Sequence, residues 1–347
     1  MEHNNLWHRF IHSKAAVLSA ILIVFVILIS FYSSGVLSGE GFGSLFTKGF
    51  MSEGNLRGIF LGMIAQCVIL CGLISLLISG NIDLSVSGQM TVTLMVFAQL
   101  CASFPGLPWP VVALLCLGLG VCLGLANTFL VNVVKIPSFI ATIGMSSIYG
   151  GIASIWTRGA NIQINRESFI AMGKAALFGR FPVLFVFAIL LIVLYGLILA
   201  KTTFGRSIYM IGGNRKAARL SGLNAKKITM ILFINNSVLA VVAGLTWAAQ
   251  MKLASPSALV LAMPDMRVIA AVILGGVSFF GGAGFITGAF AGLLLLNVFD
   301  NMLSVLQVQT FWNILMQGFV LILALFFDYM SQRSLERRVL KARFGES

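Results

Sequence analysis

The segment Leu56–Gly88 decides the fold, and it reads LRGIFLGMIAQCVILCGLISLLIS followed by GNIDLSVSG. Its first part, Leu56–Ser79, is apolar over nearly its whole length and carries one charge, Arg57, beside its start. A helix of about 20 residues crosses the roughly 30 Å of hydrocarbon in a bilayer. We therefore expect Leu56–Ser79 to span a membrane and Gly80–Gly88 to interrupt the chain before the next span.

Apolar runs of similar length recur along the whole chain. Hydrophobic residues make up 59% of the 347 positions and charged residues only 10%, whereas soluble domains carry roughly 25% charged residues. Backbone polar groups in lipid must be satisfied within one segment, which excludes open sheets. The expected fold is an all-α polytopic membrane protein with about ten transmembrane helices. The predicted spans are 15–32, 56–79, 87–104, 111–134, 138–156, 182–200, 228–251, 267–280, 285–303 and 309–329.

The basic residues predict how the chain is oriented in the membrane. An even number of spans puts both termini on one side, and placing them in the cytoplasm puts 15 of the 23 Lys and Arg residues there, seven of them between Lys201 and Lys227. The positive-inside rule selects this orientation. Membrane lipid then accounts for most of the net charge of +13, and no nucleic-acid partner is expected.

Cysteine and histidine give no sign of a metal centre. The five cysteines lie in or at the ends of predicted spans, where a free cysteine packs as a small hydrophobic side chain. The three histidines all precede the first span. We expect no disulfide, no metal site and no cofactor.

The chain is expected to form a single transmembrane domain over residues 1–347. Its longest extramembrane stretches, 33–55, 157–181 and 201–227, are too short to bury a core of their own. Two pseudo-repeated halves are predicted, roughly 56–156 and 228–328. The faint evidence is that Gly80–Gly88 and Gly276–Gly284 are interruptions of equal length bounded by glycine, as in the internal repeats of transporters.

The first interruption contains an acidic residue, Asp83. One interpretation is a tight turn in which the carboxylate caps the following helix. The other is an irregular segment that lines a water-filled cavity, because such backbone is tolerated at membrane depth only where protein or water surrounds it. Both can hold together. We take Asp83, Ser85 and Asn127 as candidates for the translocation pathway.

The second interruption belongs to a cluster of glycines. Its members are Gly275, Gly276, Gly281, Gly282, Gly284, Gly288 and Gly292, and the last three are predicted to share one helix face at a spacing of four. Small residues at this spacing let helices pack closely, which is the simpler interpretation. The alternative is a moving hinge, for which Gly275, Gly276, Gly281 and Gly282 are the candidates.

The loop Lys201–Lys227 contains a complete signal for a short helix. Asn214 is the predicted N-cap and Gly222 the stop. The expected helix presents an exposed patch of Ala217, Ala218 and Leu220 between basic residues. A lipid anchor would explain the charge alone, whereas a docking site for a cytoplasmic partner also explains the glycines and the cap. The candidate coupling residues are Gly205, Arg206, Gly212, Gly213, Asn214, Ala217, Ala218, Arg219, Leu220 and Gly222.

Polar residues inside the predicted spans are mostly amides. Interhelical hydrogen bonds are the expected role of each. Asp300 is the only ionisable residue well inside a predicted span, and an ion relay usually needs more than one. A neutral polar solute is therefore favoured. These residues are Gln66, Asn127, Asn132, Asn235, Asn236, Asn297, Asp300, Asn313 and Gln317.

At these motifs nearly the whole chain resembles the permease subunits of the bacterial ribose-type ATP-binding cassette (ABC) importers, which include the ribose, xylose and autoinducer-2 permeases. The resemblance departs at Asn81 and Ser87, where the family has glycine, and at Asp265-Met266-Arg267, where it has Glu-Leu-Asp. Arg267 thus reverses a charge near the outer face. The segments that carry the resemblance are 81–86, 125–131, 135–144, 203–206, 211–214, 217–222, 269–272 and 274–276.

The resemblance implies a permease for a monosaccharide or related solute. Its implied partners are two cytoplasmic ATP-binding subunits docked on the loop after the sixth span, a periplasmic solute-binding protein, and a second permease copy, identical or paralogous. The chain has no Gly-x-x-x-x-Gly-Lys-Ser/Thr stretch, so ATP hydrolysis is assigned to a partner. The competing interpretation is an autonomous channel or facilitator. A membrane enzyme is disfavoured, since a Gly-x-Ser-x-Gly turn and paired carboxylates are missing from the sequence.

Overall fold

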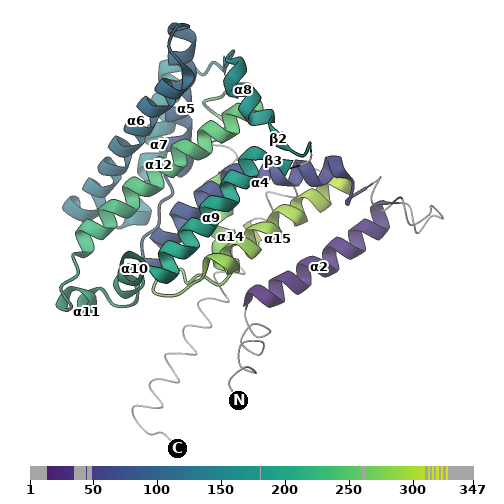
Figure 1. Ribbon diagram of the computed structural model, residues 1–347. Coiled ribbons are helices and arrows are strands. Elements are labelled where there is room, and N and C mark those ends of the chain that lie inside the picture. The colour runs from purple at the N-terminus through teal and green to yellow at the C-terminus, as the bar shows by residue number, and fades with distance from the viewer. Residues whose placement is uncertain are drawn as a thin grey trace, which may run out of the picture.

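The computed structural model describes residues 14–34, 44, 49–179, 181–259 and 263–308, together with single positions between 312 and 326. Within these residues the chain is almost entirely helical (Figure 1). The long helices are α2 (Lys14–Ser33), α4 (Glu53–Ile78), α5 (Val86–Ser103), α6 (Trp109–Phe129), α7 (Ser138–Thr157), α9 (Val183–Lys201), α12 (Ala225–Met251) and α15 (Ile286–Val305). The shorter ones are α8 (Glu167–Lys174), α10 (Thr203–Gly213), α11 (Arg215–Leu220), α14 (Pro264–Leu274) and the π-helical turn η2 (Leu130–Val134).

Seven of the described helices are long and apolar enough to cross a membrane. They are α4, α5, α6 with η2, α7, α9, α12 and α15, and each matches a predicted span within a few residues. The prediction of an all-α membrane protein is therefore confirmed, with seven candidate spans among the described residues. The predicted first span corresponds to α2, of which Ile23–Ser33 is a shorter apolar helix. The predicted tenth span, 309–329, lies almost wholly outside the described residues.

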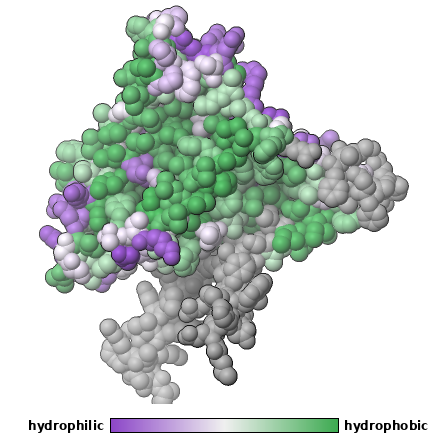
Figure 2. Space-filling model, viewed as in Figure 1, coloured by the Kyte–Doolittle hydropathy of each residue, from purple (hydrophilic) through white to green (hydrophobic). Residues whose placement is uncertain are grey.

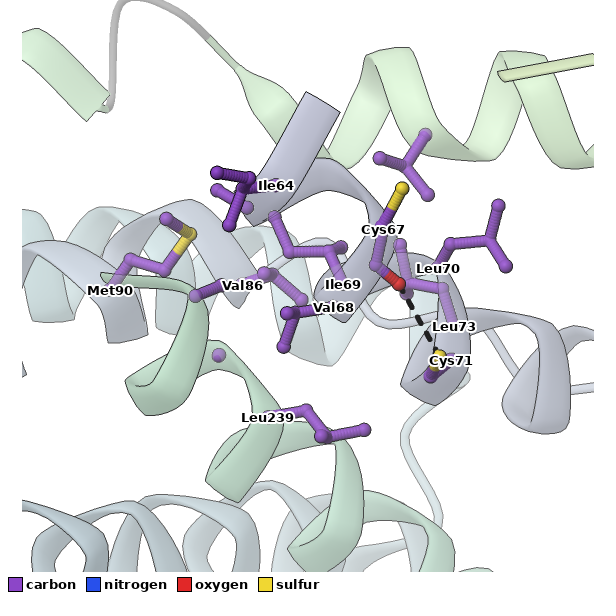
Figure 3. Packing of buried hydrophobic residues seen from close by; sticks show 14 of the residues in the cluster. Ile64, Cys67, Val68, Ile69, Leu70, Cys71, Leu73, Val86, Met90 and Leu239 are labelled. Atoms are coloured by element: carbon purple, nitrogen blue, oxygen red, sulfur yellow. Dashed lines mark hydrogen bonds between the residues drawn. The ribbon is translucent and has the colours of Figure 1, made fainter. Parts of the chain in front are cut away.

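The helix α4 lies at the centre of the bundle. It packs against α12, α9, α15 and α14, and from Met63 to Ile78 almost every side chain is buried. Figure 3 shows its aliphatic side chains meeting Val86 and Met90 of α5 and Leu239 of α12. Cys67 and Cys71 are both buried here, and the Cys71 thiol bonds only to the carbonyl oxygen of Cys67, so they pack as small hydrophobic groups as predicted.

The outer helices expose apolar side chains, as contact with lipid requires. Most of α6, α7 and α9 lies outside the buried core. Leu114, Ile148 and Leu190 are examples of their exposed side chains. Figure 2 shows a broad hydrophobic surface with hydrophilic residues gathered at its two ends. This distribution is that of an integral membrane protein.

The two ends of the bundle carry different structures. At one end, which we call the basic end, lie α10 and α11, and at the other, the opposite end, lies α8 (Figure 1). Two small antiparallel pairs of strands close the loops of the opposite end. They join β1 (Ile162–Gln163) to β4 (Leu253–Ala254) and β2 (Ala176–Leu177) to β3 (Phe181–Pro182). Arg166 also donates there to the carbonyl oxygens of Cys101 and Phe104.

The helix α14 is shorter than its predicted span. It ends at Leu274 rather than Phe280, and residues 275–285 run without regular structure to α15. Eleven residues at about 1.5 Å each cover only about half of the hydrocarbon thickness. Gly284 precedes α15 and has a positive φ of 147°, so it does not share a helix face with Gly288 and Gly292 as predicted.

Glycines allow α14 and α15 to pack against each other with almost no gap. A Cβ atom on Gly275 or Gly288 would collide with the backbone of the other, and one on Gly292 would collide with the carbonyl oxygen of Ala271. At Gly275, Gly288 and Gly292 the two helices thus pack closely, which is the simpler of the two interpretations.

We predict that Gly292→Ala lowers the thermal stability of the purified protein in detergent, because the added methyl group must push α14 away from α15. Overpacking of this kind costs about 1–3 kcal/mol. Gly118→Ala in α6 is the matched control, since a Cβ atom there meets no atom within 4 Å. The measurement is the melting temperature by fluorescence-detected size exclusion, and equal values for the two variants would contradict the prediction.

Candidate functional site

The two glycine-bounded interruptions of the sequence meet in space at the basic end. The amide of Gly282, in the loop between α14 and α15, donates to the carbonyl oxygen of Ile78 at the end of α4 at 2.8 Å. Gly80 and Gly281 both have positive φ values, 76° and 90°, and a Cβ atom on Gly281 would lie 2.8 Å from the amide nitrogen of Gly80. A side chain at either position would strain the turn.

The helix α10 packs into this meeting point. A Cβ atom on Gly212 would collide with the carbonyl oxygen of Ile78, and the Tyr209 hydroxyl donates to the carbonyl oxygen of Gly284 at 2.7 Å. Burial raises the pKa of the Tyr209 phenol, which keeps it neutral and able to donate. We call the contact among Ile78–Gly80, Gly212–Gly213 and Gly281–Gly284 the glycine junction. It brings together segments separated by up to 200 positions, because only glycines let three backbones approach so closely.

The loop after α9 folds as two short helices, of which the sequence predicted one. The Asn214 side-chain oxygen accepts from the amides of Lys216 and Ala217, both at 3.0 Å, and Gly222 follows with φ 82°, so the predicted cap and stop of α11 are confirmed. The helix α10 was missed, although Thr202 caps it by accepting from the amide of Gly205. Gly205 itself packs against the last turn of α9.

The predicted exposed patch on α11 is partly wrong. Leu220 is 90% exposed and Ala217 is exposed, but Ala218 is only 1% exposed and faces the protein. A helix of six residues cannot present three positions so close in sequence on one face. Arg206 and Arg219 are both exposed, so the outward surface of this loop consists of Leu220 surrounded by basic side chains.

A cavity of about 1110 Å³ lies beside α11. It is lined by the start of α12, by the turn between η2 and α7, and by Gly80 and Asn81 at the glycine junction. The described lining contains five basic side chains and no acidic one, so the site attracts anionic groups. The basic residues are Lys135, Arg215, Lys216, Arg219 and Lys226.

From the glycine junction the chain runs into the protein interior as the irregular segment Asn81–Ser85. All five residues are buried, and Asp83 is 0% exposed. Side chains of α7 satisfy the backbone of this segment: the Ile82 amide donates to the Ser138 hydroxyl, and the Leu84 amide donates to the Thr142 hydroxyl at 3.0 Å. These two amides therefore need no water.

Asp83, Ser85 and Asn127, predicted from separate parts of the sequence, lie in one buried hydrogen-bond network. The Asp83 carboxylate accepts from the amide and hydroxyl of Ser85 and, at 2.9 Å, from the Asn236 side chain of α12. The Ser85 hydroxyl accepts in turn from Asn127 of α6 and from Gln89 of α5.

The hydrogen bonds of Asp83 resemble those of the predicted helix cap. The carboxylate bonds to the amide of Ser85, the residue directly before α5, and it joins this turn to α12 through Asn236. Gly275 and Gly276 lie at the end of α14, while Gly281 and Gly282 lie in the glycine junction. Most of the pathway candidates therefore lie in one of two groups. Asp83, Ser85 and Asn127 belong to the hydrogen-bond network, and Gly281 and Gly282 belong to the glycine junction.

Other polar residues in the spans join helices, as predicted. Asn297 of α15 donates to the Gln66 side chain of α4 at 2.7 Å, and Tyr195 of α9 donates to Asn235 of α12. The Asn132 side chain donates to the carbonyl oxygen of Lys226, while Asn313 and Gln317 lie outside the described residues.

Two charged contacts were missed by the sequence analysis. Arg267 of α14 forms an ion pair with Asp300 of α15, so Asp300 is not an isolated charge. Asp265, two residues earlier, accepts a hydrogen bond from the hydroxyl of Ser87 in α5. The sequence did contain a signal for these contacts. The chain departs at Ser87 and at Asp265–Arg267 from the permeases that it resembles.

Comparison with known proteins identifies the family of the chain. The family described as branched-chain amino acid transport system / permease component matches residues 57–325. The L-arabinose transport system permease protein AraH of Escherichia coli is 34% identical, and the match covers 84% of this chain and 87% of that protein. The autoinducer 2 import system permease protein LsrC of E. coli is 33% identical over 81% of both chains.

A probable ABC transporter permease protein of Sinorhizobium fredii is 32% identical over 81% of this chain and 83% of that protein. No solved structure matches the chain. The relatives are transport permeases, and no enzymatic family is indicated. The chain therefore belongs to the family of branched-chain amino acid transport system permease components, and it is an integral membrane permease subunit of an ABC transporter.

Proposed function

We propose that this chain forms the passage of an ABC importer that carries a small neutral polar solute, a monosaccharide or a related sugar-like compound, across the inner membrane of a bacterium. Separate ATP-binding subunits supply the energy. The observation that carries the proposal is the glycine junction, where the loop predicted to couple to ATP hydrolysis touches both interruptions of the transmembrane helices. The names of the L-arabinose and autoinducer 2 relatives support the solute class.

The orientation that we propose places the basic end in the cytoplasm, with both termini on that side and about ten spans in all. The concentration of Lys and Arg around α10 and α11 supports it. The chain acts as a single permease domain, and its half-repeats, roughly 56–156 and 228–328, are a proposal that rests on the pair of glycine-bounded interruptions.

The partners follow from this orientation. Two ATP-binding subunits dock on α11 through Leu220 and the basic residues around it, and a periplasmic solute-binding protein docks on the opposite end. A second permease copy, identical or paralogous, completes the passage. Membrane lipid covers the exposed apolar faces of α6, α7 and α9, and no nucleic acid takes part.

The coupling that we propose is mechanical. When the ATP-binding subunits close, they push α11 and α10, and α10 bears directly on the glycine junction through Gly212 and Tyr209. Two elements leave the junction toward the membrane interior: the segment Asn81–Ser85 and the helix α14. A push on α10 therefore moves both, which biases the permease between its two access states.

Leu220→Asp is predicted to abolish co-purification of the co-expressed ATP-binding subunit, because it places an anion on the apolar centre of the docking surface. Arg219→Asp should act in the same direction by reversing a neighbouring charge. Phe178→Asp, which changes a 94% exposed residue at the opposite end, is the matched control and should leave the complex intact. Normal assembly of the Leu220→Asp variant would count against the docking role.

Gly212→Ala is predicted to separate ATP hydrolysis from transport. The added methyl group must displace the carbonyl oxygen of Ile78, whereas a Cβ atom on the neighbouring Gly213 meets no atom within 4 Å. The Gly212→Ala importer should assemble and hydrolyse ATP but lose at least about tenfold in solute uptake, a barrier of about 1.4 kcal/mol. Gly213→Ala should retain uptake, and equal behaviour of both variants would rule out coupling through the junction.

Reconstitution distinguishes the importer from an autonomous facilitator. Proteoliposomes that contain this chain with its ATP-binding subunit and solute-binding protein should accumulate labelled L-arabinose only when ATP reaches the ATP-binding subunit. Vesicles with this chain alone should not equilibrate the sugar faster than empty vesicles. Uptake at the full rate by the chain alone would overturn the importer and establish a facilitator.

A further inference from the structure

A second cavity, of about 440 Å³, lies between α5, α7 and α14. Its walls are the first turn of α5, one face of α7 and the loop that leads into α14. The polar groups that line it are five hydroxyls and one carboxylate, from Ser87, Ser146, Ser147, Ser154, Ser257 and Asp265. No role has been given so far to Ser146, Ser147 or Ser154 of α7.

Two independent paths place this cavity near the middle of the membrane. From Asp265 to its end at Leu274 the helix α14 covers about ten residues, which is about 15 Å at the rise of an α-helix, and residues 275–280 connect this end to the glycine junction. The segment Asn81–Ser85 runs from the junction to Ser87 in about six residues, at most about 20 Å when extended. Both lengths are near half of the roughly 30 Å of hydrocarbon.

The chemistry of the lining suits hydroxylated ligands. The hydroxyls of Ser147 and Ser154 donate to carbonyl oxygens of their own helix, which leaves their oxygen atoms to accept. The Asp265 carboxylate, 3% exposed, accepts from the Ser87 hydroxyl and has capacity for further donors. A neutral compound with several hydroxyl groups can donate to all of these oxygens.

The same lining argues against a zwitterionic amino acid. The described lining residues include one carboxylate and no lysine or arginine. Asp265 could bind the ammonium group of an amino acid, but no cation of the lining could bind its carboxylate, and an unpaired charge is unfavourable away from water. This is informative because the description of the matched family names branched-chain amino acids.

We propose that this cavity is a contact site for the solute inside the permease, that it takes a neutral polyhydroxylated compound, and that Ser87 and Asp265 determine this specificity. The inference rests on the proposed function, which it deepens. Ser87 opens α5 and Asp265 opens α14, and their hydrogen bond joins the far ends of the two elements that start at the glycine junction.

Cysteine labelling tests the cavity without a transport assay. In the assembled importer with Cys122→Ser, the exposed free cysteine among the described ones, we would place Ser147→Cys in the cavity and Ile148→Cys beside it on α7. A membrane-impermeant, charged methanethiosulfonate should label the Ser147 variant at least about tenfold faster. L-Arabinose, D-ribose or D-xylose should slow this labelling, whereas an equal concentration of L-leucine should not.

Equal labelling of the two variants would overturn the cavity as a water-filled site. Protection by L-leucine and by none of the three sugars would overturn the assignment to hydroxylated solutes. Either result is separate from failure of the proposed function, which would show as ATP-independent uptake by the wild-type chain with the labelling pattern unchanged.

Uptake tests the two residues that we assign to specificity. Asp265→Asn should lower ATP-driven uptake of labelled L-arabinose by about tenfold, the loss of one charge-assisted hydrogen bond, and Asp265→Glu should restore part of it. Ser87→Ala should change the ratio of L-arabinose to D-ribose uptake, because it frees one acceptor site on Asp265. Ser103→Ala, at the exposed far end of α5, is the control.

Wild-type uptake by the Asp265→Asn importer, or an unchanged sugar ratio for Ser87→Ala, would refute these roles. A merely structural effect would appear instead as equal loss for every sugar, no rescue by Asp265→Glu, and reduced assembly on size exclusion, and it would refute them as well.

Discussion

Backbone amides at membrane depth have no water to bond to, and the segment Asn81–Ser85 meets this constraint with side chains from other helices. Ser138 and Thr142 of α7 accept from its amides, and Asn236 of α12 bonds to its one carboxylate. A straight helix would have satisfied these groups within itself but would also have been rigid from end to end. The network thus makes a break in the helix possible where a transporter needs a movable part.

Close backbone contact connects this break to the loop that follows α9. At the glycine junction the end of α4, the helix α10 and the loop before α15 touch through backbone atoms, and the Tyr209 hydroxyl of α10 adds a bond to the carbonyl oxygen of Gly284. Contacts of this kind are stiff, since backbone atoms cannot change rotamer as side chains do. In the proposed coupling, displacement of α10 is transmitted to both interruptions rather than absorbed.

The charged residues of the chain occupy two different kinds of surroundings. Arg267 and Asp300 pair with each other between α14 and α15, which removes the cost of two separate charges among apolar helices. The basic residues around α11 have no such acidic partners in the cavity that they line, and they remain available to a protein partner or to anionic lipid. The cavity near Asp265 has the reverse character, with one carboxylate among hydroxyls.

By itself, the sequence determined the helical class, the positions of most spans, and the cap and stop of α11. These depend on local composition and periodicity, which neighbouring residues decide. Only the tertiary structure brought Gly80, Gly212 and Gly282 together, paired Asp265 with Ser87, and turned Ala218 inward. Such contacts join positions up to 200 residues apart, and a local pattern carries no information about which helix faces which. The same reason explains why α10 and the serines of α7 went unnoticed: their role depends on what lies across from them.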